Sequence, residues 1–311
     1  MAQRGTVFLT GGGGMVGKNI LEHSSAKQWV FLAPSSRELD LRRFDAVRDF
    51  IRECKPDIVI HAAGRVGGIQ ANMADPVDFL VTNVDLGRNV VMAAAEEGVP
   101  YLLNMGSSCM YPRSAPNPLR EEQIMQGELE PTNEGYALAK IITERLCEYL
   151  RRTRPELAYK TMIPCNLYGR HDKFSPEHSH LIPAIIYKLH QAKIRGDNDV
   201  DIWGDGTARR EFMYAGDFAD AVFHALDRFE LLPDLMNVGL GDDHAVNEYY
   251  DAAAAVMGWY GRFVHDLSKP VGMKQKVVSI ARQQAWGWQA TTSLQEGIAK
   301  TYDYYVSDYL V

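Results

Sequence analysis

Residues 6–17 read Thr6-Val7-Phe8-Leu9-Thr10-Gly11-Gly12-Gly13-Gly14-Met15-Val16-Gly17, an apolar, β-rich run that passes at once into a glycine turn. A helix-like pattern follows at residues 18–22, so the segment predicts a strand, a turn and a helix in that order. Gly11, Gly14 and Gly17 leave room for backbone N–H groups and a helix N-terminus to approach a pyrophosphate. A flexible tight turn is the other interpretation, but the position of the glycines between strand and helix favours a dinucleotide site.

Further apolar runs downstream predict the other strands of a sheet. They lie at residues 29–33, 58–64, 101–105 and 159–163, with helical patterns between them that include residues 44–54 and about 76–98. This alternation predicts an α/β fold with a Rossmann-type, doubly wound parallel sheet. We expect a dinucleotide-binding domain over residues 1–165, to which the chain returns at about 211–240. Residues 166–311 should form a smaller lobe, mainly for substrate binding.

The composition excludes several classes of protein. The 311 residues carry a net charge of −7 and a pI of about 5.7, which argues against a nucleic-acid-binding surface. No run of about 18 uncharged apolar residues and no signal-peptide pattern is present, so we expect a cytoplasmic protein without a membrane segment. His171, His178 and His180 lack the spacing of a metal site, so no metal is predicted. The cysteines have no paired short spacing and should be reduced thiols: Cys54, Cys109, Cys147 and Cys165.

The end of the second strand bears on the choice of cofactor. An NAD-binding protein usually places an acid about 20 residues after the glycine loop, where it bonds the ribose 2′-hydroxyl. No acid stands at residues 32–37, where two serine hydroxyls and Arg37 suit a 2′-phosphate better, which favours NADP(H) over NAD(H). Glu38 and Asp40 are near enough to keep NAD(H) open, and Asp40 with Leu41 could instead lie along the adenine.

A tyrosine and a lysine stand four residues apart in Thr132-Asn133-Glu134-Gly135-Tyr136-Ala137-Leu138-Ala139-Lys140, which predicts the start of a helix. At that spacing the two side chains share one helix face. A tyrosine exchanges protons near pH 7 only if its phenolate is stabilised, and a neighbouring ammonium does that. An ordinary surface pair is the alternative for this spacing taken alone.

The fourth strand opens into Gly106-Ser107-Ser108-Cys109-Met110-Tyr111-Pro112. If the backbone stays extended there, Ser107 and Cys109 point to the same side. A hydroxyl and a thiol at one strand tip, with the Tyr136 helix next in sequence, favour a functional site over an ordinary surface pair. Taken alone, Cys109 would be interpreted as a small buried residue.

The glycine loop, Ser107, Tyr136 and Lys140 resemble the extended short-chain dehydrogenase/reductase family. More narrowly, the chain resembles the GDP-L-fucose synthase family, whose members are 3,5-epimerases and 4-reductases of GDP-4-keto-6-deoxy-mannose. The stretches that carry this resemblance span nearly the whole chain: Val66-Gly67-Gly68-Ile69, residues 106–112, residues 129–134, Asn166-Leu167-Tyr168-Gly169, His171-Asp172, Ser179-His180 and Trp203-Gly204 with Gly206.

The resemblance implies roles for five residues. Tyr136 would protonate the C4 oxygen as NADPH delivers hydride to C4, and Ser107 would hold that oxygen. Lys140 would bind the nicotinamide ribose and lower the pKa of the tyrosine, the tuning that a general acid needs near pH 7. Cys109 and His180 would act as base and acid in epimerising C3 and C5, whose hydrogens the C4 ketone acidifies.

The binding residues follow from the glycine loop, the strand ends and the same resemblance. The cofactor positions are Gly11, Gly14, Met15, Val16, Gly17, Ser36, Arg37, Asp40, Leu41, Ala62, Ala63, Gly64, Asn83, Lys140, Pro164, Asn166, Leu167 and His180. The substrate positions are Ser107, Ser108, Cys109, Asn166, Lys188, Trp203 and Arg210. The chain departs from the family at Gly135 (usually proline), Lys188 (usually arginine), Ser279 (usually aspartate) and after Lys269-Pro270, where Val271 replaces an aspartate.

We therefore expect a cytoplasmic, NADPH-dependent epimerase-reductase that makes GDP-L-fucose. Because the departures leave the sugar open, the alternative is a C4-ketoreductase, with or without epimerisation, acting on a related nucleotide-linked 4-keto-deoxy sugar or heptose. A non-catalytic NADP-binding regulatory protein is a third interpretation, which Ser107, Tyr136 and Lys140 together disfavour. Family members commonly dimerise through the Tyr136 helix and the helix at 76–98, so the resemblance also implies a homodimer.

Overall fold

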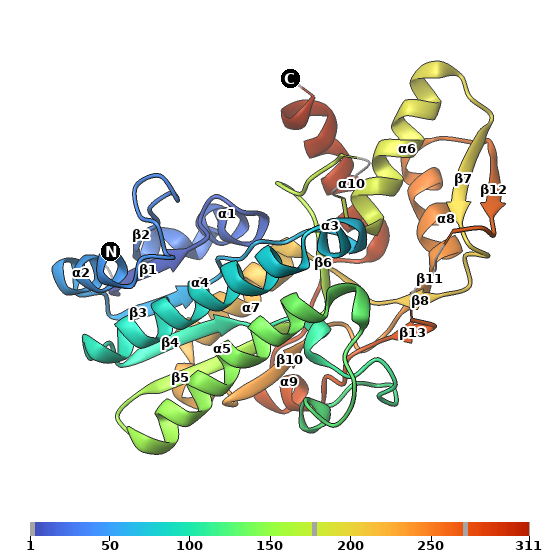
Figure 1. Ribbon diagram of the computed structural model, residues 1–311. Helices are drawn as coiled ribbons and strands as arrows, with labels where there is room; N and C mark the ends of the chain where they lie inside the picture. Colours follow the sequence, from blue (N-terminus) through green and yellow to red (C-terminus); the bar gives the residue numbers. More distant parts are fainter. Residues whose placement is uncertain (1–3, 176–178, 270–272, 311) are drawn as a thin grey trace.

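The computed structural model describes residues 4–175, 179–269 and 273–310, so His178 and Pro270-Val271-Gly272 lie outside the described residues. The central sheet has six strands in the order β10-β5-β4-β3-β1-β2, and every neighbouring pair is parallel. The predicted Rossmann-type parallel sheet is therefore confirmed (Figure 1). Its strands are β1 (Thr6–Thr10), β2 (Val30–Leu32), β3 (Ile58–His61), β4 (Tyr101–Met105), β5 (Ala158–Pro164) and β10 (Leu235–Val238).

Helices cover both faces of this sheet (Figure 1). On one face α1 (Met15–Glu22) packs against α7 (Ala215–Asp227), and on the other α2 (Phe44–Cys54), α4 (Pro76–Glu96) and α5 (Glu134–Thr153) lie side by side. Alternate residues of β1 serve the two layers: Val7 and Leu9 belong to the core under α7, and Phe8 to the core under α2 and α4. Burial on both faces explains why this strand reads as an unbroken apolar run.

Glycines allow α4 and α5 to approach closely. A Cβ at Gly87 would lie 2.0 Å from Oγ1 of Thr143, and a Cβ at Gly135 would lie 3.0 Å from the carbonyl oxygen of Pro76. Gly135 stands where the resembled family has proline, so this departure relieves a tight contact between the first turns of the two helices. The glycine at position 135 is therefore explained by the packing of α5 against α4.

The C-terminal lobe has its own core. This core lies among α6 (Leu181–Arg195), α8 (Val246–Met257) and α10 (Leu294–Tyr304). At its outer side β7 (Asp199–Trp203) pairs in parallel with β12 (Arg262–Asp266). Where the chain passes between the lobes, β6 (Asn166–Tyr168) pairs with β9 (Phe212–Tyr214). The chain then returns to the large domain through α7, and β10 joins the large sheet next to β5.

A small sheet of three strands lies at the junction of the lobes (Figure 1). In it β8 (Arg209–Arg210) stands between β11 (His244–Ala245) and β13 (Gln275–Lys276). The register places Gln275 beside Arg209 and Lys276 beside Arg210. Sequence periodicity does not predict strands of two residues, because two residues contain no repeat.

Shorter segments complete the described chain. They are α3 (Ile69–Ala74), α9 (Ala281–Trp286), a π-helical turn at Tyr305–Tyr309, and 3-10 turns at Ser24–Gln28, Ser108–Met110, Glu121–Gln123, Pro131–Asn133 and Phe229–Leu231. Helix α3 begins directly after the glycine pair Gly67-Gly68, and Gly68 is its N-cap. Every helix in the described ranges is too short or too polar to cross a membrane.

Candidate active site

The glycine turn forms a cradle at the carboxyl end of β1. A Cβ at Gly17 would lie 2.2 Å from the carbonyl oxygen of Gly11, so only glycine allows α1 to approach the turn this closely. Gly11 has a φ of +73°, and a Cβ there would lie 2.7 Å from the backbone of Ala62. Helix α1 begins at Met15 after Gly14, which has no side chain to cap the first N–H groups. The residues present therefore fit the diphosphate of a dinucleotide.

The predicted 2′-phosphate contacts lie after β2. Arg37 is exposed and makes no ion pair with any residue that the structure describes. Both carboxylate oxygens of Asp40 accept hydrogen bonds from Arg42 at 2.9 Å, which lowers the pKa of Asp40. Glu38 accepts a hydrogen bond from the N–H of Ser35 at 2.7 Å, which lowers its pKa. Both acids are engaged locally, whereas the guanidinium of Arg37 is open to an anion.

Asn83 on α4 holds the loop after β3. Its Oδ1 accepts a hydrogen bond from the N–H of Arg65 at 2.8 Å, and its Nδ2 donates to the carbonyl oxygens of Arg65 at 3.1 Å and Phe79 at 2.7 Å. A Cβ at Gly64 would lie 3.2 Å from Asn83 Oδ1 and 3.9 Å from Lys140 Nζ. Asn83 therefore shapes a loop that passes next to the candidate catalytic lysine.

Ser107 is the N-cap of a 3-10 turn at Ser108–Met110, so the backbone does not stay extended through Cys109, which was the condition for the two side chains to point to the same side. The cause is local, because the hydroxyl oxygen of Ser107 accepts a hydrogen bond from the N–H of Cys109 at 3.2 Å. The Ser107 hydroxyl also bonds to Tyr136, whereas the Cys109 thiol meets Lys276 of β13. Ser108 is buried within the turn.

Tyr136 and Lys140 lie in the first two turns of α5, with Nζ 5.8 Å from the centroid of the phenol ring. The ammonium donates a hydrogen bond to the carbonyl oxygen of Met105 at 2.8 Å. Burial raises the pKa of Tyr136 and the nearby Cys109 raises it further, while the hydrogen bond with Ser107 lowers it. Burial lowers the pKa of Lys140 to about 8. At neutral pH the phenol therefore holds its proton and can donate it.

The thiol of Cys109 has two partners that the sequence analysis did not identify. Asn133 Nδ2 donates to Sγ at 3.2 Å, and Lys276 Nζ lies 3.8 Å from Sγ. Asn133 stands three residues before Tyr136 on the same segment, a local signal that could have indicated it. Lys276 lies 167 residues from Cys109 along the chain, and no local pattern connects the two.

His180 is the N-cap of α6. Burial lowers the pKa of its imidazole, and the ammonium groups of Lys173 and Lys276 lower it further. His171 turns elsewhere and bonds through Nε2 to Glu22 at 2.7 Å. Within the described ranges no cluster of His, Cys, Asp or Glu could hold a metal ion.

The indole of Trp203 at the end of β7 lies among positive charges. Lys188 Nζ is 5.7 Å and Lys269 Nζ 5.4 Å from the ring centroid. Lys188 also donates to a carboxylate oxygen of Asp201 at 2.8 Å. The predicted substrate residues Lys188 and Trp203 are therefore in contact, and Lys269 joins them at the same ring.

Arg210 and Asn166 lie nearer the junction of the lobes. Arg210 is partly buried, and this burial lowers the pKa of its guanidinium, while acidic neighbours that include Glu130 raise it. Its Nη1 donates to the carbonyl oxygen of Arg209 at 2.8 Å. Asn166 Nδ2 donates to the carbonyl oxygen of Glu211 at 2.8 Å, which ties β6 to the segment that follows β8.

The structure thus brings Ser107, Cys109, Tyr136 and Lys140 together at the end of β4, with Lys276 linking them electrostatically to His180. A cavity of about 200 Å³, lined by α3, the start of α4 and residues 131–136, adjoins this group.

Lys188 and Trp203 belong to the outer part of the C-terminal lobe. The remaining predicted cofactor residues lie on α1 or at strand ends: Val16 in the first turn of α1, Ser36 and Leu41 after β2, Ala63 after β3, Pro164 at the end of β5 and Leu167 in β6.

Comparisons with known proteins agree with this geometry. The model of the NAD dependent epimerase/dehydratase family matches residues 7–239. The chain is 50% identical over 302 residues to a GDP-L-colitose synthase from Yersinia pseudotuberculosis, covering 97% of this chain and 98% of the relative. It is also 50% identical over 301 residues to a GDP-L-fucose synthase from Azorhizobium caulinodans, covering 97% and 96%. A GDP-mannoheptose C4 reductase from Campylobacter jejuni, solved with NADP bound, superposes with a TM-score of 0.89 at 28% identity over 99% of this chain and 100% of that one.

Proposed function

The chain belongs to the NAD dependent epimerase/dehydratase family, and on that basis we propose that it is an NADPH-dependent epimerase-reductase converting GDP-4-keto-6-deoxy-mannose to GDP-L-fucose. The observation that carries the proposal is that the groups suited to ketone reduction lie next to a thiol that could serve as the base of epimerisation. Ser107 bonds to Tyr136, which suits ketone reduction, and the Cys109 thiol acts on both Tyr136 and Lys140. A thiol beside a reductase triad supplies a base that reduction alone does not need.

Epimerisation uses the acidity of the carbons next to the C4 ketone. The Cys109 thiolate takes a proton from C3 or C5: the C–H bond breaks, an S–H bond forms and the electron pair moves to the C4 oxygen. His180 then donates a proton to the opposite face of that carbon and the ketone re-forms. Burial and two ammonium groups lower the pKa of His180, which makes its imidazolium a stronger acid but the minor form at neutral pH.

Reduction follows at the same carbonyl. When NADPH is bound, its nicotinamide supplies hydride to C4. Tyr136 donates its phenolic proton to the C4 oxygen, and the Ser107 hydroxyl holds that oxygen by a hydrogen bond. The Lys140 ammonium, anchored on the carbonyl oxygen of Met105, stabilises the phenolate that remains.

The cofactor of this proposal is NADP(H). The glycine cradle accommodates a diphosphate, and the exposed Arg37 offers a guanidinium to a 2′-phosphate while Asp40 is held by Arg42. The similar heptose reductase was solved with NADP bound, which supports the same choice. We also propose a cytoplasmic location, since all four cysteines are free thiols, as in a reducing compartment.

A second candidate product is GDP-L-colitose. The relative of that name is as similar as the fucose synthase, and Lys188 and Ser279 depart from the resembled family in the substrate lobe. Colitose lacks the C3 hydroxyl of fucose, so the two substrates differ at a carbon that Cys109 would deprotonate. Competition between GDP-4-keto-6-deoxy-mannose and its 3-deoxy counterpart gives the ratio of kcat/KM values, which decides between them.

The first test is NADPH oxidation with GDP-4-keto-6-deoxy-mannose in deuterated water, with the product analysed by NMR. We expect turnover, deuterium at C3 and C5, and an L-fucose product. NADPH oxidation without deuterium would reduce the proposal to a ketoreductase. Absence of turnover with this sugar, but turnover with the 3-deoxy counterpart or a GDP-linked keto-heptose, would move the substrate to that compound.

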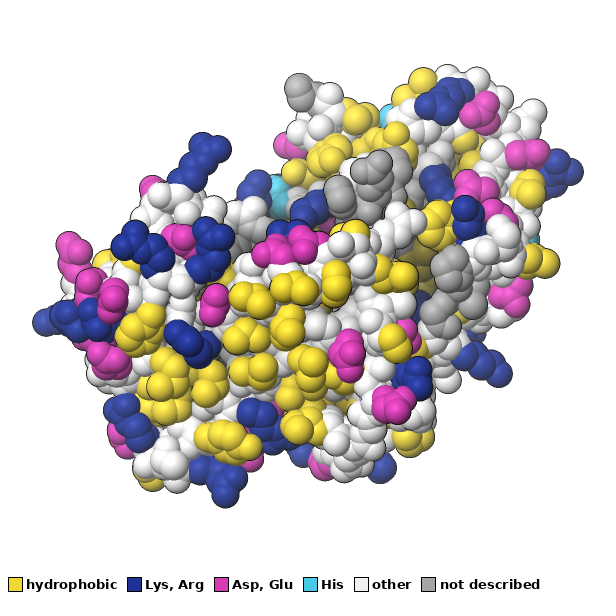
Figure 2. Space-filling model, viewed as in Figure 1, with side chains coloured by type: hydrophobic (Ala, Val, Ile, Leu, Met, Phe, Trp, Pro, Cys, Tyr) yellow, Lys and Arg dark blue, Asp and Glu magenta, His cyan; other side chains and the backbone are white. Residues whose placement is uncertain are grey.

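We propose a homodimer formed through α4 and α5. Figure 2 shows hydrophobic side chains gathered over these helices, and those that are exposed include Val77, Val81, Leu138, Ile142 and Tyr149. A contiguous apolar surface of this kind on a protein marks an interface. A second copy of the chain is the occupant that the family resemblance implies.

The dimer can be broken by one charge in this surface. Ile142→Arg should convert the protein to a monomer in sedimentation velocity, because a guanidinium would be buried without a partner. Leu231→Arg is the matched control, since Leu231 is 72% exposed and lies outside α4 and α5. A monomeric wild type, or an Ile142→Arg variant that stays dimeric, would contradict the proposed interface.

A further inference from the structure

Lys276 is unassigned in the mechanism above, yet its ammonium lies on the thiol that the mechanism uses. Its Nζ is 3.8 Å from Cys109 Sγ, and in the described part of the chain it is the only ammonium with a hydrogen-bond contact to that sulfur. It also acts electrostatically on His180. One cation therefore lies within range of both residues that epimerisation would use.

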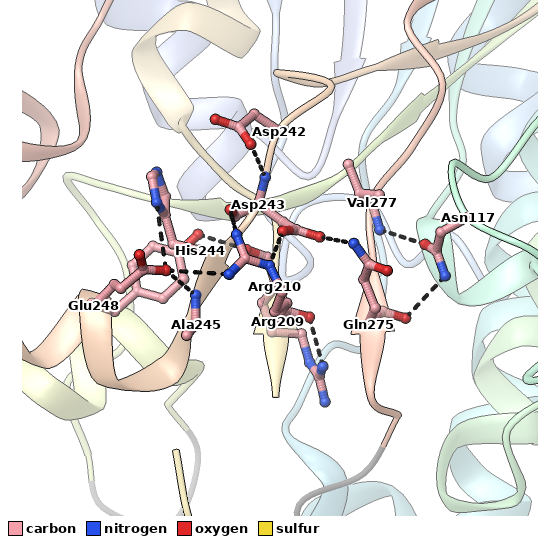
Figure 3. Close-up of polar contacts among 11 residues, drawn as sticks. Asn117, Arg209, Arg210, Asp242, Asp243, His244, Ala245, Glu248, Gln275 and Val277 are labelled. Carbon is pink, nitrogen blue, oxygen red and sulfur yellow. Dashed lines mark hydrogen bonds and ion pairs between the residues drawn. The ribbon is translucent and has the colours of Figure 1, made fainter. Parts of the chain in front are cut away.

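The fold holds Lys276 from both sides along its strand. Asn117 Nδ2 donates to the carbonyl oxygen of Gln275 at 3.3 Å, and Asn117 Oδ1 accepts from the N–H of Val277 at 2.9 Å (Figure 3). These two contacts flank Lys276 and fix the backbone that carries it. A lysine on a mobile loop would not be held in this way.

A carboxylate reinforces the same strand. Asp243 accepts from Arg209 Nε at 2.5 Å and from Gln275 Nε2 at 2.7 Å, so it joins β8 to β13 (Figure 3). Arg209 and Gln275 are register partners, and Lys276 and Arg210 form the next pair. Side chains alternate along a strand, so Arg209 and Gln275, which both bond to Asp243, lie on one face of this pair of strands. Lys276 and Arg210 then lie on the opposite face.

We propose that Lys276 is a positioning residue that holds Cys109 as a thiolate, the form that can remove a proton from the sugar. The inference deepens the proposed function and rests on it for the role of the thiol. The groups that face Cys109 are Ser107 in its own turn, Asn133 before α5, Tyr136 and Lys140 on α5, and Lys276 on β13. The Lys140 ammonium is bound to the carbonyl oxygen of Met105 and lies beside Tyr136, whereas the Lys276 ammonium contacts the sulfur itself.

The effect on the thiolate follows from Coulomb's law. Even with the full screening of water, a positive charge about 4 Å from a sulfur stabilises the anion by an amount that corresponds to about one pH unit. At pH 7 this raises the thiolate fraction about tenfold.

The test titrates Cys109 without any sugar. Wild type and Lys276→Met are alkylated with iodoacetamide across pH 5–10, and the rate at Cys109 is measured by peptide mass spectrometry. We expect the midpoint at Cys109 to rise by about one pH unit in Lys276→Met. Cys54, a partly exposed thiol on α2, gives an internal reference whose profile should not move.

Two further variants separate charge from structure. Lys274→Met removes an exposed lysine two residues away on the same segment and should leave the profile of wild type. Lys276→Arg keeps the charge and should restore most of the midpoint shift. Deuterium exchange into the proposed sugar should fall about tenfold at pH 7 in Lys276→Met and recover as the pH rises.

The outcomes distinguish this inference from the proposed function. An unmoved Cys109 midpoint in Lys276→Met, with NADPH affinity unchanged to show that the variant folds, would overturn the role of Lys276 whatever the sugar is. A moved midpoint with no deuterium exchange in wild type would uphold the ion pair and overturn the proposed epimerisation instead.

Discussion

The groups proposed for reduction and those proposed for epimerisation are assembled in different ways. Ser107, Tyr136 and Lys140 come from the end of β4 and from α5, which pack against each other in the large domain. Cys109, His180 and Lys276 come from three segments that meet only at the junction of the lobes. The first set depends on local spacing within one rigid layer. The second depends on how the C-terminal lobe packs against the large domain. Reduction and epimerisation should therefore respond differently to substitutions.

Tyr136→Phe should give the largest difference between the rate of reduction and the rate of epimerisation. The variant removes the proton donor for the C4 oxygen, so NADPH oxidation should fall by about 10²- to 10⁴-fold. Deuterium exchange at C3 and C5 needs Cys109 and His180 and should continue at a rate within about threefold of wild type. Both rates are measured by NMR on one sample. An equal fall in the two rates would mean that the halves are not separable, and full reductase activity would overturn the role of Tyr136.

Asp243→Asn should affect the other half, and less strongly. An amide nitrogen would face the donors of Arg209 or Gln275, which loosens β13 and moves Lys276 relative to Cys109. We expect deuterium exchange to fall about three- to tenfold, while NADPH affinity, a property of the large domain, stays within twofold. Asp251→Asn, an exposed acid on α8, is the control. A loss of NADPH affinity equal to the loss of exchange would show that Asp243 serves the whole fold.

The same difference explains what sequence could predict. The glycine cradle, the parallel sheet and the Tyr136/Lys140 pair depend on spacing within one or two elements, and the pattern of residues encodes that spacing. The boundaries of α2 and β4 were predicted to the residue for the same reason. Local periodicity is sufficient where a helix or strand is long enough to repeat.

The contacts of Cys109 show where sequence reasoning stops. The turn at Ser108–Met110 depends on whether the Ser107 hydroxyl bonds to the backbone, a competition that residue pattern does not decide. The contact with Lys276 joins residues 167 positions apart through strands of two residues. The two lysines at Trp203 likewise come from α6 and from the segment after β12, so only the tertiary structure brings them to one ring.

Replacing Glu211, at the junction of the two lobes, should have the smallest effect, a change in how the stability of the protein depends on pH. Its carboxylate is buried and accepts hydrogen bonds from the N–H groups of Leu240, Gly241 and Val278, at 2.6, 2.9 and 2.7 Å. Burial nevertheless dominates and raises the pKa of Glu211 to about 7. The unfolded chain ionises near pH 4.5, so the folded state binds the proton more tightly. Its stabilising contribution is complete below pH 4.5 and is lost as the pH rises through 7.

We therefore expect the free energy of unfolding in urea to fall by about 3 kcal/mol more in wild type than in Glu211→Gln between pH 4.5 and pH 8. Glu53→Gln removes an exposed carboxylate of α2 and should keep the pH dependence of wild type. Because Glu211 ties β8 to the loops after β10 and β13, away from the glycine cradle, NADPH affinity should stay constant over the pH range in which stability falls. Equal pH dependence in wild type and Glu211→Gln would mean that the Glu211 carboxylate does not control the pH dependence of stability. The junction of the lobes would then be no more sensitive to pH than the large domain.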